Sequence, residues 1–304
     1  MIRVIMFDLG NTLVRESDRT LFPHVSTALT ALSGFSTDLG DPVPLCLVSN
    51  FPAQLPVPPA LLPQVFASFL QILDEAQLRS FFEPVVQRVT LSAHAGVAKP
   101  AAVCFTEALE RLGLAVGFDA CLFITEEAAH ITNVRGFGMH ALQFGGHQDP
   151  SPAGSDFTDW AEAPLLIARA AFPENHNNMK SAVRGFLEAT HPLSVSSVKG
   201  AGNQFAATAA AHVPLPGNLS KALTGVLIDV PVQVQVQLDD RGKPIQVVGT
   251  EPSPADVSDV ALNVESLVSS GQIAGLNESP LGPTYHIATN SKGERVLKRN
   301  RYTV

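Results

Sequence analysis

The segment of residues 3–13 (Arg-Val-Ile-Met-Phe-Asp-Leu-Gly-Asn-Thr-Leu) constrains this chain more than any other. Its apolar run has the length of a buried β-strand and stops abruptly at Asp8, and Gly10 and Asn11 follow as turn formers. In an open α/β sheet, ligands bind outside the carboxyl ends of the strands. Asp8 is therefore expected at the edge of a crevice, as a nucleophile or a ligand of a hard cation. On this segment alone, the alternative is a loop aspartate that caps the next turn.

Short apolar runs alternate with amphipathic stretches through the first half of the chain. Helices are predicted over residues 22–32, 65–73, 101–112 and 158–172. Strands are predicted over residues 4–7, 45–48, 85–91, 121–124 and 141–144. This alternation is typical of an α/β domain with a doubly wound parallel sheet.

The pattern changes after the polar segment of residues 173–178, which gives the predicted boundary between domains 1–175 and 179–304. Valine and glutamine alternate over residues 232–237, a period of two that is typical of a strand with one buried face. Helices are predicted over residues 179–190 and 256–269, and hairpin turns at 239–242 and 289–293. We expect a smaller α+β domain with antiparallel hairpins.

Composition bounds the function classes. Of 304 residues, 45% are hydrophobic and 16% charged, which predicts a sizeable core. Residues 1–178 hold 9 basic and 18 acidic side chains, and residues 179–304 hold 11 and 10, so neither half has the cationic excess of a nucleic-acid binder. No apolar run or signal sequence predicts a membrane segment, and we expect a cytoplasmic protein. The three cysteines lack metal-ligand spacing and are expected to be buried and reduced.

Three further segments follow residues 4–13 in a recognisable order. They are residues 45–50 (Leu-Cys-Leu-Val-Ser-Asn), residues 96–100 (Gly-Val-Ala-Lys-Pro) with 105–113, and residues 121–127 (Cys-Leu-Phe-Ile-Thr-Glu-Glu) with 136–139. Together these segments resemble the four motifs of the haloacid dehalogenase (HAD) superfamily, across roughly the first half of the chain. The short interval between the first two motifs leaves room for little or no cap. The second half resembles no family that we recognise.

The resemblance implies a Mg²⁺-dependent phosphatase. Asp8 matches the nucleophile that attacks phosphorus, and Lys99 matches the lysine that offsets negative charge. The implied substrate-binding residues are Ser49, Asn50 through its backbone N–H, and Thr12. The implied Mg²⁺ ligands are Asp8, a backbone carbonyl near Gly10, and Glu126, with Glu127 as the alternative to Glu126.

Each of these residues also has an ordinary structural interpretation. Lys99 fits a solvated helix start, and Ser49 fits the common serine at a strand end. Glu126 and Glu127 fit a helix N-terminus, where acidic side chains interact favourably with the helix dipole.

Three departures weaken the resemblance. Gly10 stands where the phosphatases carry a second Asp as general acid and base. Loss of such a group typically lowers the reaction rate by about 10²–10⁴-fold. In the fourth motif, Thr125 and Glu126 stand where the family usually has Gly-Asp. His130 stands near an expected acidic position, although a polar residue on a helix surface explains it better. Dehalogenases and phosphonatases also lack the second Asp, but this interval has little room for their caps.

Two hypotheses of different class follow. The first is a HAD-type hydrolase that acts on a small phosphorylated substrate through an aspartyl nucleophile. The second is a catalytically degenerate HAD-like scaffold whose C-terminal domain contacts a protein partner or forms a homodimer. Neither hypothesis includes a nucleic acid or a membrane as partner.

Overall fold

The computed structural model describes residues 1–51, 54–215, 223–274, 285–290 and 293–299. The chain forms two compact units. One comprises Met1–Ala189 with Leu238–Pro244, and the other comprises Thr190–Gln237 with Ile245–Val304. Within the described ranges, no helix is long and apolar enough to cross a membrane.

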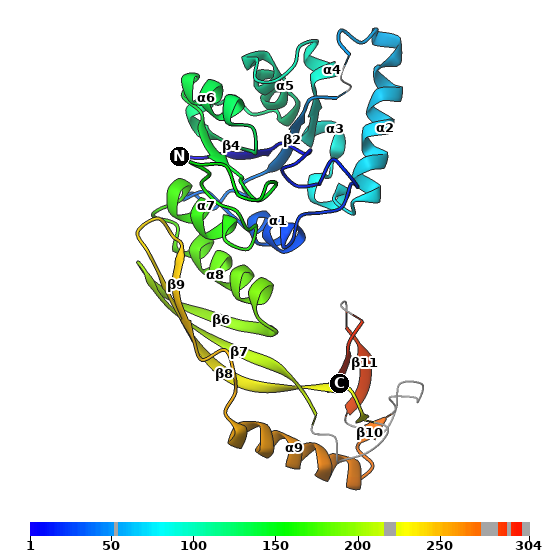
Figure 1. The fold of residues 1–304 in the computed structure, drawn as a ribbon, viewed down its shortest axis with the longest axis vertical. Helices are drawn as coiled ribbons and strands as arrows, with labels where there is room; N and C mark the ends of the chain where they lie inside the picture. The colour runs from blue at the N-terminus through cyan, green and yellow to red at the C-terminus, as the bar shows by residue number, and fades with distance from the viewer. Residues whose placement is uncertain (52–53, 216–222, 275–284, 291–292, 300–304) are drawn as a thin grey trace. The chain divides into compact units, whose positions relative to one another are not determined.

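The first unit is built on a five-stranded parallel sheet with the order β3-β2-β1-β4-β5 (Figure 1). Its strands are β1 (Val4–Phe7), β2 (Leu45–Ser49), β3 (Val89–Leu91), β4 (Cys121–Thr125) and β5 (His140–Gln143). The chain runs from β1 outward to one edge and then returns, so that β4 pairs with the other side of β1. The strand order therefore switches direction between β1 and β4, where a ligand crevice is expected.

Helices cover both faces of this sheet (Figure 1). The helices of the first unit are α1 (Val25–Ser33), α2 (Leu62–Glu75), α3 (Val85–Arg88), α4 (Ser92–Ala95), α5 (Ala102–Leu112), α6 (Ala128–Gly136), α7 (Ala163–Ala171) and α8 (His176–Thr190). Val4 and Met6 belong to one core with α5 and α6. Phe7 faces the opposite side, with its ring 6.2 Å from Phe82 and 6.1 Å from Trp160. The predicted doubly wound α/β architecture is confirmed, and burial on both faces explains the unbroken apolar sequence of β1.

The segment of residues 85–91 differs from the single strand that the sequence predicts. It begins as α3, whose first turn follows Pro84, and becomes β3 only at Val89. The amide of Arg88 donates to the Pro84 carbonyl at 3.1 Å, and strand pairing begins where Val89 aligns with Leu47. The apolar residues fit either structure, and pairing with β2 decides where the strand starts.

The division between the units lies farther along the chain than residue 175, because α8 groups with the first unit. Its apolar face, which includes Val183 and Leu187, is buried. The Asn178 amide accepts a hydrogen bond from the Ser36 backbone N–H at 3.0 Å and donates to the Ser36 carbonyl at 2.8 Å. These contacts tie α8 to the chain after α1.

The second unit holds a mixed sheet with the order β10-β11-β12-β8-β7-β6, and β9 pairs with β8. Its elements are β6 (Leu193–Ala201), β7 (Gln204–Pro214), β8 (Val226–Leu238), β9 (Pro244–Val248), α9 (Pro254–Ser269), β10 (Ile273–Ala274), β11 (Tyr285–Thr289) and β12 (Arg295–Arg299). Along β8 the valines are buried and the glutamines exposed, as the alternation predicts. Ala261 and Val264 of α9 pack with Val226 and Ile228, which completes the smaller α+β unit.

The strand pairing of this sheet goes beyond the predicted hairpins. β11 and β12 pair antiparallel as predicted, although residues 291–292 of their turn lie outside the described residues. β12 pairs parallel with β8, and β10 pairs parallel with β11. The antiparallel pair β6–β7 was not predicted, because its small alanine, serine and threonine side chains give little contrast between the two faces.

Candidate active site

Asp8 lies at the switch point of the first sheet. It follows Phe7, whose neighbours in the parallel register are Leu47 on β2 and Ile124 on β4. The Asp8 amide extends this pairing by donating to the Ile124 carbonyl at 2.9 Å. The residues that follow β1, β2 and β4 therefore emerge side by side at one edge of the sheet.

Lys99 and Asp8 form an ion pair at this edge. Lys99 Nζ lies 2.5 Å from Asp8 Oδ2, and the two side chains are only 1% and 11% exposed. The other oxygen, Asp8 Oδ1, accepts a hydrogen bond from the Leu9 backbone N–H at 2.7 Å. Removing charges from water is costly, and the attraction between Lys99 and Asp8 offsets the cost of burying the Asp8 carboxylate.

Asn50 fixes the backbone that carries Lys99. Its side-chain Oδ1 accepts a hydrogen bond from the Lys99 N–H at 2.7 Å, and its Nδ2 donates to the Lys99 carbonyl at 3.5 Å. The sequence predicts only the Asn50 backbone N–H as a phosphate donor. In the structure its side chain also joins the end of β2 to the loop that precedes α5.

Glu126 lies directly after β4 and is oriented by two hydroxyls. Thr12 Oγ1 donates to Glu126 Oε2, and the Glu126 backbone N–H donates to Thr12 Oγ1 at 3.1 Å. Thr125 Oγ1 lies 3.2 Å from Glu126 Oε2 and 3.3 Å from Asp8 Oδ2. A hydroxyl has one proton to donate, so Thr125 can satisfy only one carboxylate at a time. The carboxylates of Asp8 and Glu126 thus lie on either side of the same Thr125 hydroxyl group.

The pKa of Glu126 is raised above its ordinary value. Burial is the largest cause, and the negative charge of Asp8 adds to it. The Thr12 hydrogen bond and the positive charge of Lys99 act in the opposite direction. Burial and the neighbouring Asp8 charge together outweigh these two effects.

Thr12 orients another side chain rather than lining the cavity. It is fully buried, its hydroxyl binds Glu126, and its carbonyl accepts a hydrogen bond from Trp160 Nε1 at 2.9 Å. The substrate-binding role predicted for Thr12 does not match this position. The sequence does not show whether the Thr12 hydroxyl faces the substrate or Glu126, because this depends on the direction of the turn after β1.

The donor set at this edge fits a Mg²⁺ ion. Asp8 and Glu126 supply carboxylate oxygens, the donors that Mg²⁺ prefers. A cation between them would relieve the repulsion that contributes to the raised pKa of Glu126. Within the described ranges no three His, Cys, Asp or Glu side chains gather as a metal cluster. The remaining positions would therefore fall to a backbone carbonyl, as predicted near Gly10, and to water, which Mg²⁺ usually retains.

A cavity of about 350 Å³ opens at Asp8. Its polar lining includes Ser49, Asn50, Glu126, Glu127 and His130. Its apolar lining includes Phe51, Phe69 and Ile72, and the segment after β1 contributes Arg15, Glu16 and Arg19. The volume lies near the lower end of the range for small-molecule sites. The predicted residues Asp8, Gly10, Ser49, Asn50 and Glu126 all border this cavity, and Lys99 lies directly behind Asp8.

His130 also faces the cavity, whereas the sequence favours a helix-surface position. Burial lowers the pKa of His130, and the positive charge of Lys99 lowers it further. A neutral imidazole is therefore favoured there.

The charged residues of the segment after β1 were not predicted as part of the site. Arg15, Glu16 and Arg19 have no spacing relative to Asp8 that signals a shared cavity, and charged loop residues are usually only solvated. Their place depends on how residues 10–22 fold back.

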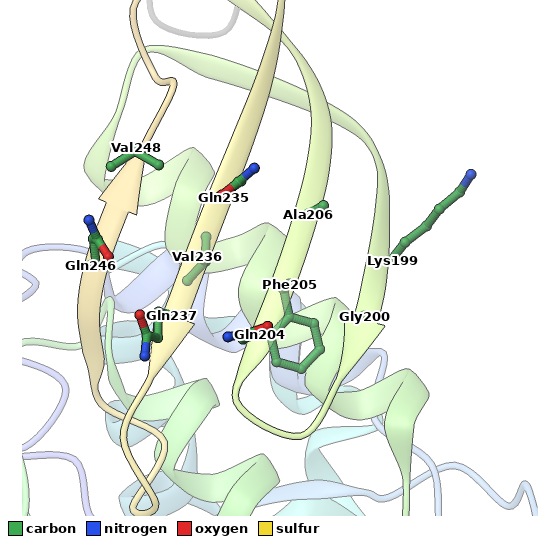
Figure 2. A pocket seen from close by; sticks show the side chains of 10 residues that line it. All are labelled: Lys199, Gly200, Gln204, Phe205, Ala206, Gln235, Val236, Gln237, Gln246 and Val248. Atoms are coloured by element: carbon green, nitrogen blue, oxygen red, sulfur yellow. The ribbon is translucent and has the colours of Figure 1, made fainter.

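A second hollow, of about 480 Å³, lies on β6–β9 of the second unit (Figure 2). Four glutamines and Lys199 are the polar side chains that line it. Its lining holds no carboxylate, histidine or cysteine. It therefore lacks both a strong nucleophile and a charged ligand for a hard cation.

No protein-family model matches this chain, and no curated protein matches it. Solved structures match about half of it. A haloacid dehalogenase-like protein of unknown function from Agrobacterium tumefaciens is 15% identical, covers 55% of this chain and 98% of its own, and has a TM-score of 0.40. The L-2-haloacid dehalogenase of Xanthobacter autotrophicus is 14% identical, covers 56% and 100%, and has a TM-score of 0.39. A putative HAD-hydrolase from Bacillus subtilis, bound to magnesium, is 12% identical, covers 55% and 98%, and has a TM-score of 0.37. These are distant likenesses.

Proposed function

We propose that the first unit is a HAD-type hydrolase that cleaves small phosphate monoesters through an aspartyl nucleophile with the help of Mg²⁺. The observation that carries this proposal is the Asp8–Lys99 ion pair at the carboxyl edge of β1. It stands beside Glu126, at the wall of a cavity of about 350 Å³. An aspartate carboxylate can act as the nucleophile, and a fixed lysine cation stabilises the charge of a phosphoryl group during its transfer.

The chemistry begins with attack of an Asp8 oxygen on phosphorus. The bond from phosphorus to the ester oxygen breaks, and an aspartyl-phosphate forms. Lys99 offsets negative charge as the dianionic substrate approaches Asp8, and Asn50 keeps the loop of Lys99 in place. The Ser49 hydroxyl, at the end of β2, provides a donor for a phosphate oxygen. Water then attacks phosphorus, which releases inorganic phosphate and restores Asp8.

Mg²⁺ bound by Asp8 and Glu126 would supply the remaining positive charge for the phosphate oxygens. Glu126 is held for this role by the Thr12 hydroxyl. The cavity volume limits the substrate to a small organic phosphate. Its apolar wall of Phe51, Phe69 and Ile72 accommodates the carbon skeleton.

The test measures phosphate release from a panel of small phosphomonoesters with Mg²⁺. We expect Asp8→Asn to lower kcat by at least about 10³-fold, because the nucleophile is lost. Asp18→Asn is the matched control, since Asp18 lies in the exposed segment after β1, bonds to Thr20 and does not line the cavity. Acid-quenched protein should carry phosphate on Asp8. Absence of turnover by the unaltered chain across the panel would refute the phosphatase proposal and favour a scaffold.

A further inference from the structure

Gly10 stands at the position where the resemblance to the HAD phosphatases implies a general acid and base. Gly10 is not among the glycines with a left-handed backbone, so its conformation does not require a glycine. A Cβ atom built on Gly10 would lie 2.6 Å from Glu16 Oε1 and 3.3 Å from the carboxyl carbon of Glu16. The space of a side chain at position 10 is thus filled by the carboxylate of Glu16.

The fold of the segment after β1 brings Glu16 back to Gly10. Gly10 pairs with Val14, and Val14 pairs with Leu21, so that residues 10–21 form a compact double turn. The Glu16 backbone N–H donates to the Asn11 side chain at 3.2 Å. Val14 is buried and anchors the turn in the unit. The position of Glu16 therefore follows from backbone contacts on either side of it.

Glu16 shares the cavity with Asp8. Both residues line the same cavity of about 350 Å³, together with Gly10. Glu16 is also exposed, so solvent reaches its side chain. Its nearest cations in the segment, Arg15 and Arg19, also line this cavity.

We propose that Glu16 is the general acid and base of this site, where its carboxyl group replaces the side chain that Gly10 lacks. The proposal rests on the phosphatase function of Asp8. In the first step, Asp8 bonds to phosphorus, the bond from phosphorus to the ester oxygen breaks, and the Glu16 carboxyl gives its proton to the departing alkoxide. In the second, the Glu16 carboxylate takes a proton from water, the water oxygen bonds to phosphorus, and the phosphorus–Asp8 bond breaks. The second step returns both carboxyl groups to their starting states.

The leaving group provides a sharp test. The alkoxide of an alkyl phosphate is a poor leaving group and needs a proton on its oxygen. The 4-nitrophenolate of 4-nitrophenyl phosphate departs readily without one. We expect Glu16→Gln to lower kcat/KM for an alkyl phosphate by about 10²–10⁴-fold. For 4-nitrophenyl phosphate, phosphorylation of Asp8 should be little changed, but the phosphoenzyme should accumulate because water lacks its base. Asp18→Asn is the control and should match the unaltered chain on both substrates.

A rescue variant separates catalysis from a structural effect. Glu16→Ala should lose activity on the alkyl phosphate, and Gly10→Asp in the Glu16→Ala background should regain part of it, since the space at position 10 is then open. Equal losses on both substrates without phosphoenzyme accumulation would overturn the role of Glu16. Unaltered turnover by Glu16→Gln would also overturn it while leaving the phosphatase proposal intact. Failure of the unaltered chain to form any phosphoenzyme would instead overturn the phosphatase proposal, and this inference with it.

Discussion

Lys99 Nζ lies 2.5 Å from Asp8 Oδ2, although Asp8 follows the central strand β1 and Lys99 precedes α5. No sequence pattern close to either residue predicts that the two side chains meet. The parallel sheet brings them together, because β1 and β3 end at the same edge and Asn50 ties the Lys99 backbone to the end of β2. The pair is thus a product of the fold, and its energetics can be tested separately from catalysis.

Removing the cation of this pair should destabilise the first unit. Lys99→Met leaves the Asp8 carboxylate nearly buried without its partner, which costs about 3–5 kcal/mol for a buried pair. Asp8→Asn in the same chain should recover part of that loss, because no charge then remains unpaired. Urea unfolding of the two single variants and the double variant measures this coupling. Additive effects of the two substitutions would contradict the ion pair.

Thr12 should control Mg²⁺ affinity through Glu126. Thr12→Val keeps the shape of the side chain but removes the hydroxyl that donates to the Glu126 carboxylate. Loss of such an orienting partner weakens metal binding by about 10–100-fold. Calorimetric titration with Mg²⁺ measures the change without any substrate. Thr132→Val is the control, since that exposed hydroxyl donates to the Ala128 carbonyl of its own helix and Thr132 does not line the cavity. Equal affinities of the two variants would contradict the role of Thr12.

The pH dependence of stability should include a contribution from His94. Its Nδ1 accepts a hydrogen bond from the Leu91 backbone N–H at 3.0 Å, which requires an unprotonated nitrogen. Burial lowers the pKa of His94 to about 4, and the positive charge of Arg111 adds to the effect. The unfolded chain therefore binds the proton first as the pH falls below 6.5, so stability declines between pH 6.5 and about 4.

After allowance for partial exposure of the ring, this decline should amount to about 1–2 kcal/mol. His94→Gln should flatten it, whereas the exposed His140→Gln should not. Urea midpoints measured across this pH range provide the comparison. An unchanged slope in His94→Gln would show that other groups cause the decline.

The three cysteines should resist thiol reagents in the folded chain. Cys46, Cys104 and Cys121 are free and buried. Burial raises the pKa of each thiol, that of Cys121 to about 12, so the reactive thiolate is scarce at neutral pH. A chromogenic disulfide reagent should titrate no thiol under native conditions and three in denaturant. Rapid labelling of the folded chain would show that the cores around β2, α5 and β4 open readily.

The sequence by itself determined the elements whose pattern is strong and local. An apolar run that stops at a carboxylate is enough to predict β1 with Asp8 at its end, because burial on both faces requires such a run; the role of Asp8 needed the other motifs as well. The strict alternation of β8 likewise predicts one buried face, and the helix start and stop signals around residues 100 and 113 predict α5. These properties belong to neighbouring residues and need no knowledge of the fold.

Only the tertiary structure decided which side chains share a site and which way they face. Thr12 and Ser49 are both polar residues near strand ends, yet Thr12 turns inward to Glu126 while Ser49 borders the cavity. Glu16 looks like an ordinary loop acid until the segment after β1 folds back over Gly10. The reason is physical: pairing across the sheet and the direction of each turn set the distances between residues far apart in the chain, and no local pattern encodes those distances.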